Sequence, residues 1–266
     1  MTNRENRRLK GRIVFAMMTS FAAGMVNVSS LVLFFSFSSN VTGHYAILAS
    51  EIAKGNLVRI LTALGWIAMY FAGSFFSGSL MRKRPAASSF SFAPAVVPML
   101  LEISCLLAAG FYGHYFYAET LVETELLVAL LLFAMGLQNG MTASLKGFGL
   151  KTTHLTGLTT DLALNTAQWF QEPAQRADAS ARLKQMFAIA AGYIAGGTLA
   201  GCIIHYFHFW VFIYIALAMV LILAYSLVRT KLLRETYRRR RVRNRELFDQ
   251  PVLRPNKLVL KKSTGL

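Results

Sequence analysis

Two short polar segments contrast with the apolar sequence around them. "TTHLTGLTTDLA" covers residues 152–163, and a near-copy, "SSNVTGHYAILA", covers residues 38–49. Both segments offer hydroxyl, imidazole and amide or carboxylate groups, which bind small polar solutes through hydrogen bonds. The elements that position these groups therefore decide what chemistry the segments can serve.

The composition indicates that these groups lie in a membrane protein. Of 266 residues, 55% are hydrophobic and only 15% are charged, whereas about a quarter of the residues in a soluble domain are charged. Apolar runs of roughly 20 residues, the length of a helix that crosses a ~30 Å hydrocarbon core, can be found six times in the sequence. They are Ile13–Phe35, Leu57–Met81, Phe92–Tyr112, Leu126–Leu145, Met186–His205 and Phe209–Val228. We therefore expect an all-α integral membrane protein with six transmembrane helices.

Positive charge gathers at the two ends of the chain. Residues 1–12 carry five basic residues against one acidic residue, and residues 229–266 carry thirteen against three, out of a net charge of +16. Positive residues that flank spans stay on the cytoplasmic side of the membrane. We therefore predict a basic cytoplasmic N-terminus, residues 1–12, and a basic cytoplasmic tail, residues 230–266. The connection that follows the third span is acidic, which agrees with six crossings.

The tail contains the run "RRRRVRNR", from Arg238 to Arg245. Clusters of four to eight basic residues beside a span bind anionic lipid at about 1 kcal/mol per residue. Nucleic-acid binding would require base-reading or stacking groups that this run does not contain. We therefore expect anionic lipid as the partner of this run, and no nucleic acid.

Three matches in the same order indicate an internal repeat. "FAAGMVN" (21–27) matches "FAMGLQN" (133–139), and "YFAGSFFSG" (70–78) matches "YIAGGTLAG" (193–201). Between them lie the two Thr-Gly pairs of the polar segments. Each copy holds three spans, an odd number, so residues 13–115 and 126–229 are predicted to form inverted three-helix repeats. In many secondary transporters the substrate site lies at the midplane between such repeats.

The Thr-Gly pairs predict broken segments that face a common cavity, because non-helical backbone at membrane depth must be buried or line water. The cavity would take Ser38, Ser39 and His44 from one copy and Thr152, Thr153 and Thr160 from the other. The residues that we predict to bind substrate are Asn27, Asn40, Thr42, Asn139, His154, Thr156 and Asp161. Four of these residues have an alternative: Asn27 and Asn139 could join helices, His154 could satisfy a local hydrogen bond, and Asp161 could be a solvated interfacial acid.

Two further features lie within the spans. Glu102 is ten residues into the third span, where a charge costs a few kcal/mol, so it is either a proton-coupling group or a protonated, hydrogen-bonded acid. Glycines at 73, 78, 196 and 201 favour close helix packing, within the bundle or at a homodimer seam. The two cysteines, Cys105 and Cys202, fall inside predicted spans and indicate neither a disulfide nor a metal site.

The motifs "GLQNG", "KTTHLTGLTTDLA", "AGMVN" and "SSNVTGH" resemble those of the YoaK family, a family of bacterial inner-membrane proteins also catalogued as a domain of unknown function. The resemblance covers roughly residues 12 to 230. It implies a polytopic protein of the bacterial inner membrane. One departure is Asn27, where similar members often carry an aspartate.

Three classes of function can be weighed. A transporter or permease for a small solute accounts for the repeat, the broken segments and the buried acid together. A membrane scaffold or interaction protein, anchored to anionic lipid, accounts for the tail and requires no cavity. An enzyme is disfavoured, because the sequence has no HExxH or GxSxG motif and no clustered Cys and His ligands. We therefore expect a transporter without a cofactor or metal.

Overall fold

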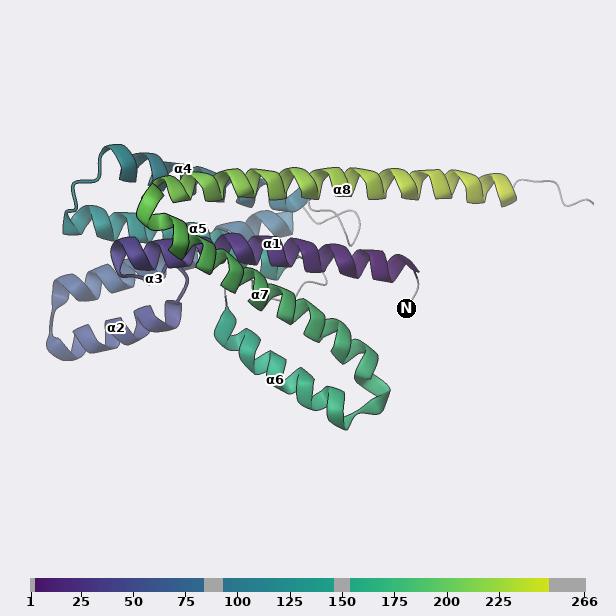
Figure 1. Cartoon of the computed structure of the whole chain (residues 1–266), viewed down its shortest axis with the longest axis horizontal. Coiled ribbons are helices and arrows are strands. Elements are labelled where there is room, and N and C mark those ends of the chain that lie inside the picture. The colour runs from purple at the N-terminus through teal and green to yellow at the C-terminus, as the bar shows by residue number, and fades with distance from the viewer. Residues whose placement is uncertain (1–2, 84–92, 146–153, 249–266) are drawn as a thin grey trace, which may run out of the picture.

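The computed structural model describes residues 3–83, 93–145 and 154–248, and every regular element in these ranges is a helix (Figure 1). Six of the described helices are long and apolar enough to cross a membrane, which confirms the multi-pass helical prediction. They are α1 (Asn3–Phe34), α3 (Leu57–Lys83), α4 (Val96–Tyr115), α5 (Leu121–Ser144), α7 (Arg176–Phe207) and α8 (Trp210–Phe248).

Several helix boundaries differ from the predicted spans. Helix α5 begins at Leu121, because the Thr120 hydroxyl accepts the Glu123 N–H and the Glu123 carboxylate accepts the Thr120 N–H, each at 3.3 Å. This capping box satisfies the first-turn donors five residues before the predicted start. Helix α7 likewise begins ten residues early, in a polar stretch. Phe92, the predicted start of the third span, lies outside the described residues.

Helix α8 continues well past its apolar segment. The span ends at Leu232, yet the same helix runs on to Phe248 and projects beyond the bundle (Figure 1). The basic run from Arg238 to Arg245 is therefore helical, although its side chains lie outside the described part of the structure. The final part of the predicted tail, residues 249–266, also lies outside it.

Two shorter helices in the described ranges, α2 (Val41–Lys54) and α6 (Leu155–Gln171), follow α1 and α5 along the chain. With 14 and 17 residues they are shorter than the ~20 residues that a span requires. Helix α3 runs back along α2, and α7 runs back along α6 (Figure 1). Helix α2 ends at a left-handed Gly55, with φ of 70°, and α6 is followed by the 3-10 turn η2 (Pro173–Gln175).

The closest contacts between spans join α1 to α7 and α3 to α5. Glycine brings the backbones together in both pairs. A Cβ atom on Gly24 of α1 would overlap the carbonyl oxygen of Tyr193, and one on Gly136 of α5 would overlap that of Tyr70. Such small-residue contacts are typical of membrane helices.

The four glycines that the repeat singles out divide into two kinds. Gly73 and Gly196 lie directly against backbone carbonyl groups of α5 and α1. A Cβ on Gly78 or Gly201 would instead meet only a side chain, at an ordinary 3.9 or 3.8 Å. Close packing is therefore confirmed for Gly73 and Gly196 and not for the other two.

Helices α4 and α8 pack on each other and complete the bundle against α5 and α1. Fully buried apolar side chains fill this part of the core, among them Met99 and Leu106 of α4 and Phe212 and Ile215 of α8. The first turn of α1 and the last turn of α8 lie toward the same end of the bundle (Figure 1).

The orientation of the bundle can be tested with single cysteines. The connection before α5 and the start of α7 lie near opposite ends of the bundle (Figure 1), and Ala118 in the first and Asp178 in the second are exposed. In a background with both native cysteines replaced by alanine, we expect an impermeant thiol reagent to label Ala118→Cys in intact cells and Asp178→Cys only after permeabilisation, because basic residues near Asp178 favour the cytoplasm. Labelling of both from the same side would contradict the six-span topology.

Candidate functional site

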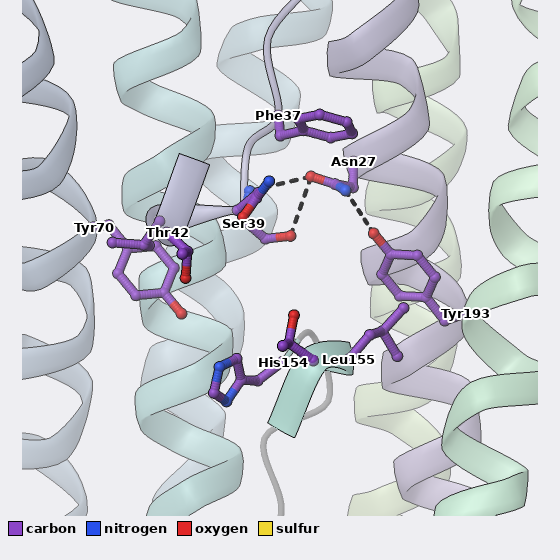
Figure 2. A pocket seen from close by; sticks show the side chains of 11 residues that line it. Asn27, Phe37, Ser39, Thr42, Tyr70, His154, Leu155 and Tyr193 are labelled. Atoms are coloured by element: carbon purple, nitrogen blue, oxygen red, sulfur yellow. Dashed lines mark hydrogen bonds between the residues drawn. The ribbon is translucent and has the colours of Figure 1, made fainter. Parts of the chain in front are cut away.

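A cavity of about 330 Å³ lies where the first turns of α2 and α6 approach each other (Figure 2). Tyr70, on its wall, stands at the midpoint of the apolar span Leu57–Arg82. The volume is at the small end of the range for small-molecule pockets. The lining residues are Asn27, Phe37, Ser39, Asn40, Val41, Thr42, Tyr70, His154, Leu155, Thr156 and Tyr193.

Asn27 of α1 holds one wall of the cavity in place. Its Oδ1 accepts hydrogen bonds from the Ser38 hydroxyl at 3.3 Å and from both the backbone N–H and the hydroxyl of Ser39 at 3.1 Å. Its Nδ2 donates to the Tyr193 hydroxyl at 2.5 Å (Figure 2). Phe35, just after α1, adopts a left-handed φ of 53°, so the chain turns out of the helix and back toward Asn27. One amide thus joins α1, the segment before α2, and α7.

Asn139 of α5 makes the corresponding bond on the other side of the cavity. Its Nδ2 donates to the hydroxyl of Tyr70. Asn27 and Asn139 occupy the same position in one pair of matched segments, and Tyr193 and Tyr70 occupy the same position in another. Asn139 is buried and does not line the cavity. Its hydrogen-bond partner Tyr70, however, lines the cavity.

The two short helices begin in the same way. Asn40 and His154 are their N-caps, with φ and ψ of −86° and 72° in one and −92° and 70° in the other. The Asn40 Oδ1 accepts the N–H of Gly43 at 3.2 Å, whereas the His154 side chain makes no such bond. A Cβ on Gly43 would come within 2.9 Å of the Asn40 Nδ2, and one on Gly157 within 3.0 Å of the His154 Nδ1.

These glycines therefore make room for the cap side chain and do not themselves interrupt a helix. Both Thr-Gly pairs lie in the first turn of a helix, at its second and third residues. Among glycines in the described ranges, only Gly55 has a positive φ. The interruption that the sequence suggested lies before each pair. The prediction that the Thr-Gly pairs themselves are non-helical is therefore wrong, because both pairs lie within a regular helix.

The structure brings five of the seven predicted binding residues to the cavity, namely Asn27, Asn40, Thr42, His154 and Thr156. Asp161 is exposed on α6 and does not line the cavity, so its role stays a prediction. Thr160 is also exposed, and its hydroxyl donates to the Thr156 carbonyl at 3.3 Å. Thr152 and Thr153 lie outside the described residues.

His44 has a structural role in α2. Its side chain is buried, its Nε2 lies 2.9 Å from the Phe37 carbonyl oxygen, and its ring meets the edge of Trp66 at 5.2 Å between centroids. These contacts anchor α2 to the segment before it and to α3. His44 is not among the cavity residues.

The sequence reasoning did not select two of the polar groups on the wall, the hydroxyls of Tyr70 and Tyr193. Both face the cavity from opposite sides (Figure 2). The internal repeat could have indicated them, because Tyr70 begins the segment "YFAGSFFSG" and Tyr193 begins the matched segment "YIAGGTLAG". Phe37, Val41 and Leu155 complete the lining and gave no such signal.

Glu102 is separate from the cavity. Its side chain is fully buried in α4, and neither carboxyl oxygen has a hydrogen-bond partner within the described ranges. Within the same ranges, no three His, Cys, Asp or Glu side chains gather in a way that could hold a metal ion. The cavity wall offers hydroxyl, amide and imidazole groups, and no Asp or Glu stands among the lining residues that the structure describes.

A comparison with protein families matches residues 15–226 to a family described as "Protein of unknown function (DUF1275)". The matched range includes every residue that lines the cavity. Comparisons with curated proteins and with solved structures gave no match.

Proposed function

The chain belongs to the DUF1275 family, and we propose that it carries a small solute across the membrane, with the substrate held in the cavity between α2 and α6. One observation carries this proposal: a polar cavity beside the midpoint of an apolar span is bounded by the first turns of two helices too short to span. Transporters typically build their substrate sites from the ends of such discontinuous helices. A scaffold protein would require no such cavity.

The proposal includes an inverted repeat of residues 13–115 and 126–229. In its support, contacts in one half have counterparts in the other. The pair α1 and α7 corresponds to α5 and α3, and α2 packs on α3 as α6 packs on α7. The bond from Asn27 to Tyr193 corresponds to the bond from Asn139 to Tyr70. A site between inverted repeats can open to either side of the membrane by the same movement.

Membrane, orientation and lipid contact belong to the same proposal. The resemblance to the YoaK family supports the bacterial inner membrane, and the basic residues at both ends support cytoplasmic termini. The run from Arg238 to Arg245 lies on the helical extension of α8, where basic residues would contact anionic lipid of the cytoplasmic leaflet.

The test is uptake into proteoliposomes of radiolabelled acetate, glycine, ribose and ethylammonium. We expect Thr42→Val combined with Thr156→Val to lower uptake of the transported solute about tenfold or more, because two wall hydroxyls are lost, each worth about 0.5–1.5 kcal/mol as a hydrogen bond. Thr159→Val is the matched control, because Thr159 is exposed on α6 and its hydroxyl bonds only to its own helix, at the Leu155 carbonyl. Wild-type uptake in the double variant would place the pathway elsewhere.

The same uptake assay tests Glu102, which we propose to carry the coupled proton. A fully buried carboxyl group within a span is costly and is usually retained for function. Glu102→Gln keeps the shape of the side chain and removes the titratable group. We expect the variant to fold and to lose the dependence of uptake on a pH gradient. Unchanged pH dependence would assign Glu102 to packing alone.

A further inference from the structure

We infer that the cavity selects a small solute that carries a negative charge, a carboxylate or another oxyanion, and holds that charged group between the first turns of α2 and α6. The inference rests on the proposed substrate role of the cavity and adds the chemical class of the substrate. It is argued from the positions, donors and acceptors of the wall.

The same three positions of each short helix form the wall. They are the N-cap and the first two residues, Asn40 to Thr42 in α2 and His154 to Thr156 in α6. The N-terminus of a helix carries a partial positive charge of about half an elementary charge. Neither helix has an acidic residue in its first turn. Two positive helix ends therefore meet at one cavity without a neutralising side chain.

The first turn of α6 has backbone hydrogen-bond donors without an acceptor in the described part of the chain. The Leu158 N–H donates to the His154 carbonyl at 3.0 Å. For the N–H groups of Leu155, Thr156 and Gly157, we find no acceptor among the described residues, and the His154 side chain does not cap them. Free first-turn amides of this kind bind anions.

The two side-chain amide oxygens on the wall, by contrast, already accept hydrogen bonds. The Asn27 Oδ1 accepts three hydrogen bonds from Ser38 and Ser39, and the Asn40 Oδ1 accepts one from Gly43. Among the described residues that line the cavity, none is Asp or Glu. A cation would require carboxylate or free carbonyl oxygens here. The described part of the wall instead offers hydroxyl and backbone N–H donors and no carboxylate.

Depth strengthens this preference. At mid-span the surroundings are apolar, so interactions between a charge and fixed dipoles are larger than in water. The cavity volume of about 330 Å³ limits the solute to a small molecule. A small anion is favoured over a neutral solute of the same shape where the two helix ends and the wall donors together offset the cost of removing the charge from water.

The test measures binding to the purified full chain in detergent at constant ionic strength. Propanoate and propanamide have nearly the same shape and differ mainly in charge, as do acetate and acetamide, and ethylammonium is a small cation for comparison. We expect propanoate and acetate to bind about tenfold or more tightly than their amides, from two favourable helix ends, and ethylammonium to bind no better than the amides. Equal binding of acids and amides would overturn the inference.

A negative charge placed in the cavity by substitution provides a second test of the inference. Thr156→Asp puts a carboxylate in the first turn of α6, where it favours the helix but competes with a bound anion. Thr159→Asp adds the same net charge to the exposed face of α6 and is the matched control. We expect propanoate binding to be lost in the first variant and kept in the second. Thr42→Asp makes the equivalent change in α2 if Thr156→Asp does not fold. Undiminished binding in a folded cavity variant would contradict the inference.

Failures of the two proposals can be told apart. If uptake of a neutral or cationic solute depends on Thr42 and Thr156 while acids bind no better than amides, the transport proposal stands and the anion inference is wrong. If propanoate binding depends on charge and on these positions while no solute in the panel is taken up, the anion inference stands and transport loses its support.

Discussion

Replacing Gly196 by alanine is expected to push α7 away from α1 and to lower the free energy of unfolding by about 3 kcal/mol, the upper end of the usual range for overpacking. The added Cβ would overlap the carbonyl oxygen of Phe21, which is backbone and cannot move aside by changing a rotamer. Gly73→Ala, which meets the carbonyl of Phe133 in the pair α3 and α5, is expected to have a similar effect.

Gly201 and Gly78 are the matched controls, because they lie in the same two helices at the equivalent next position of the repeat. A Cβ there has an ordinary contact of 3.8 or 3.9 Å, and alanine has the higher helix propensity by about 1 kcal/mol. We therefore expect neutral or slightly stabilised proteins. Thermal unfolding in a mild detergent separates the two classes. Equal stability of Gly196→Ala and Gly201→Ala would mean that the α1 and α7 backbones do not touch.

Asn27→Ala is expected to have the second largest effect on stability, a loss of about 2 kcal/mol, because buried donors lose their acceptor. The Ser38 hydroxyl and both donors of Ser39 would be left without the Oδ1 atom, and the Tyr193 hydroxyl without the Nδ2 donor. The segment before α2 would then lose its attachment to α1, so solute binding should fall together with stability.

The comparison variant is Gln168→Ala, which removes an amide whose Nε2 donates to the Gln175 Oε1 at 2.7 Å in a solvent-exposed bond. We expect a change within about 0.5 kcal/mol there. A double-mutant cycle of Asn27→Ala with Tyr193→Phe isolates the bond between the two helices. Additive effects in that cycle would show that Asn27 acts on the segment before α2 alone.

The spans could be predicted from the sequence because hydropathy over a ~20-residue window is a direct consequence of the bilayer core. Their ends were less predictable. The start of α5 depends on a capping box between Thr120 and Glu123, and the start of α7 lies in a polar stretch that hydropathy alone does not assign to a helix. Local hydrogen bonding, which an apolar window does not register, sets these ends.

The candidate site was predictable where polar residues recur at matched places. Asn27, Asn40, Thr42, His154 and Thr156 were found in this way. Tyr70 and Tyr193 were not selected, because a tyrosine within an apolar run is ordinary in a membrane helix, and only the fold shows that their hydroxyls meet Asn139 and Asn27. The backbone N–H groups of α6 have no signature in residue type at all, since every residue except proline carries one.

The glycine contacts have a mechanical consequence. They join α1 to α7 and α3 to α5 at backbone distance, and each pair carries one short helix, α6 on α7 and α2 on α3. The chain thus contains two closely packed helix pairs, each with its short helix and each assembled from both halves of the sequence. The pair α1 and α7 contributes Asn27, Tyr193 and the first turn of α6 to the cavity wall. The pair α3 and α5 contributes Tyr70 and the first turn of α2. The cavity lies between the two pairs, so a movement of one pair relative to the other would change the distance between the first turns of α2 and α6.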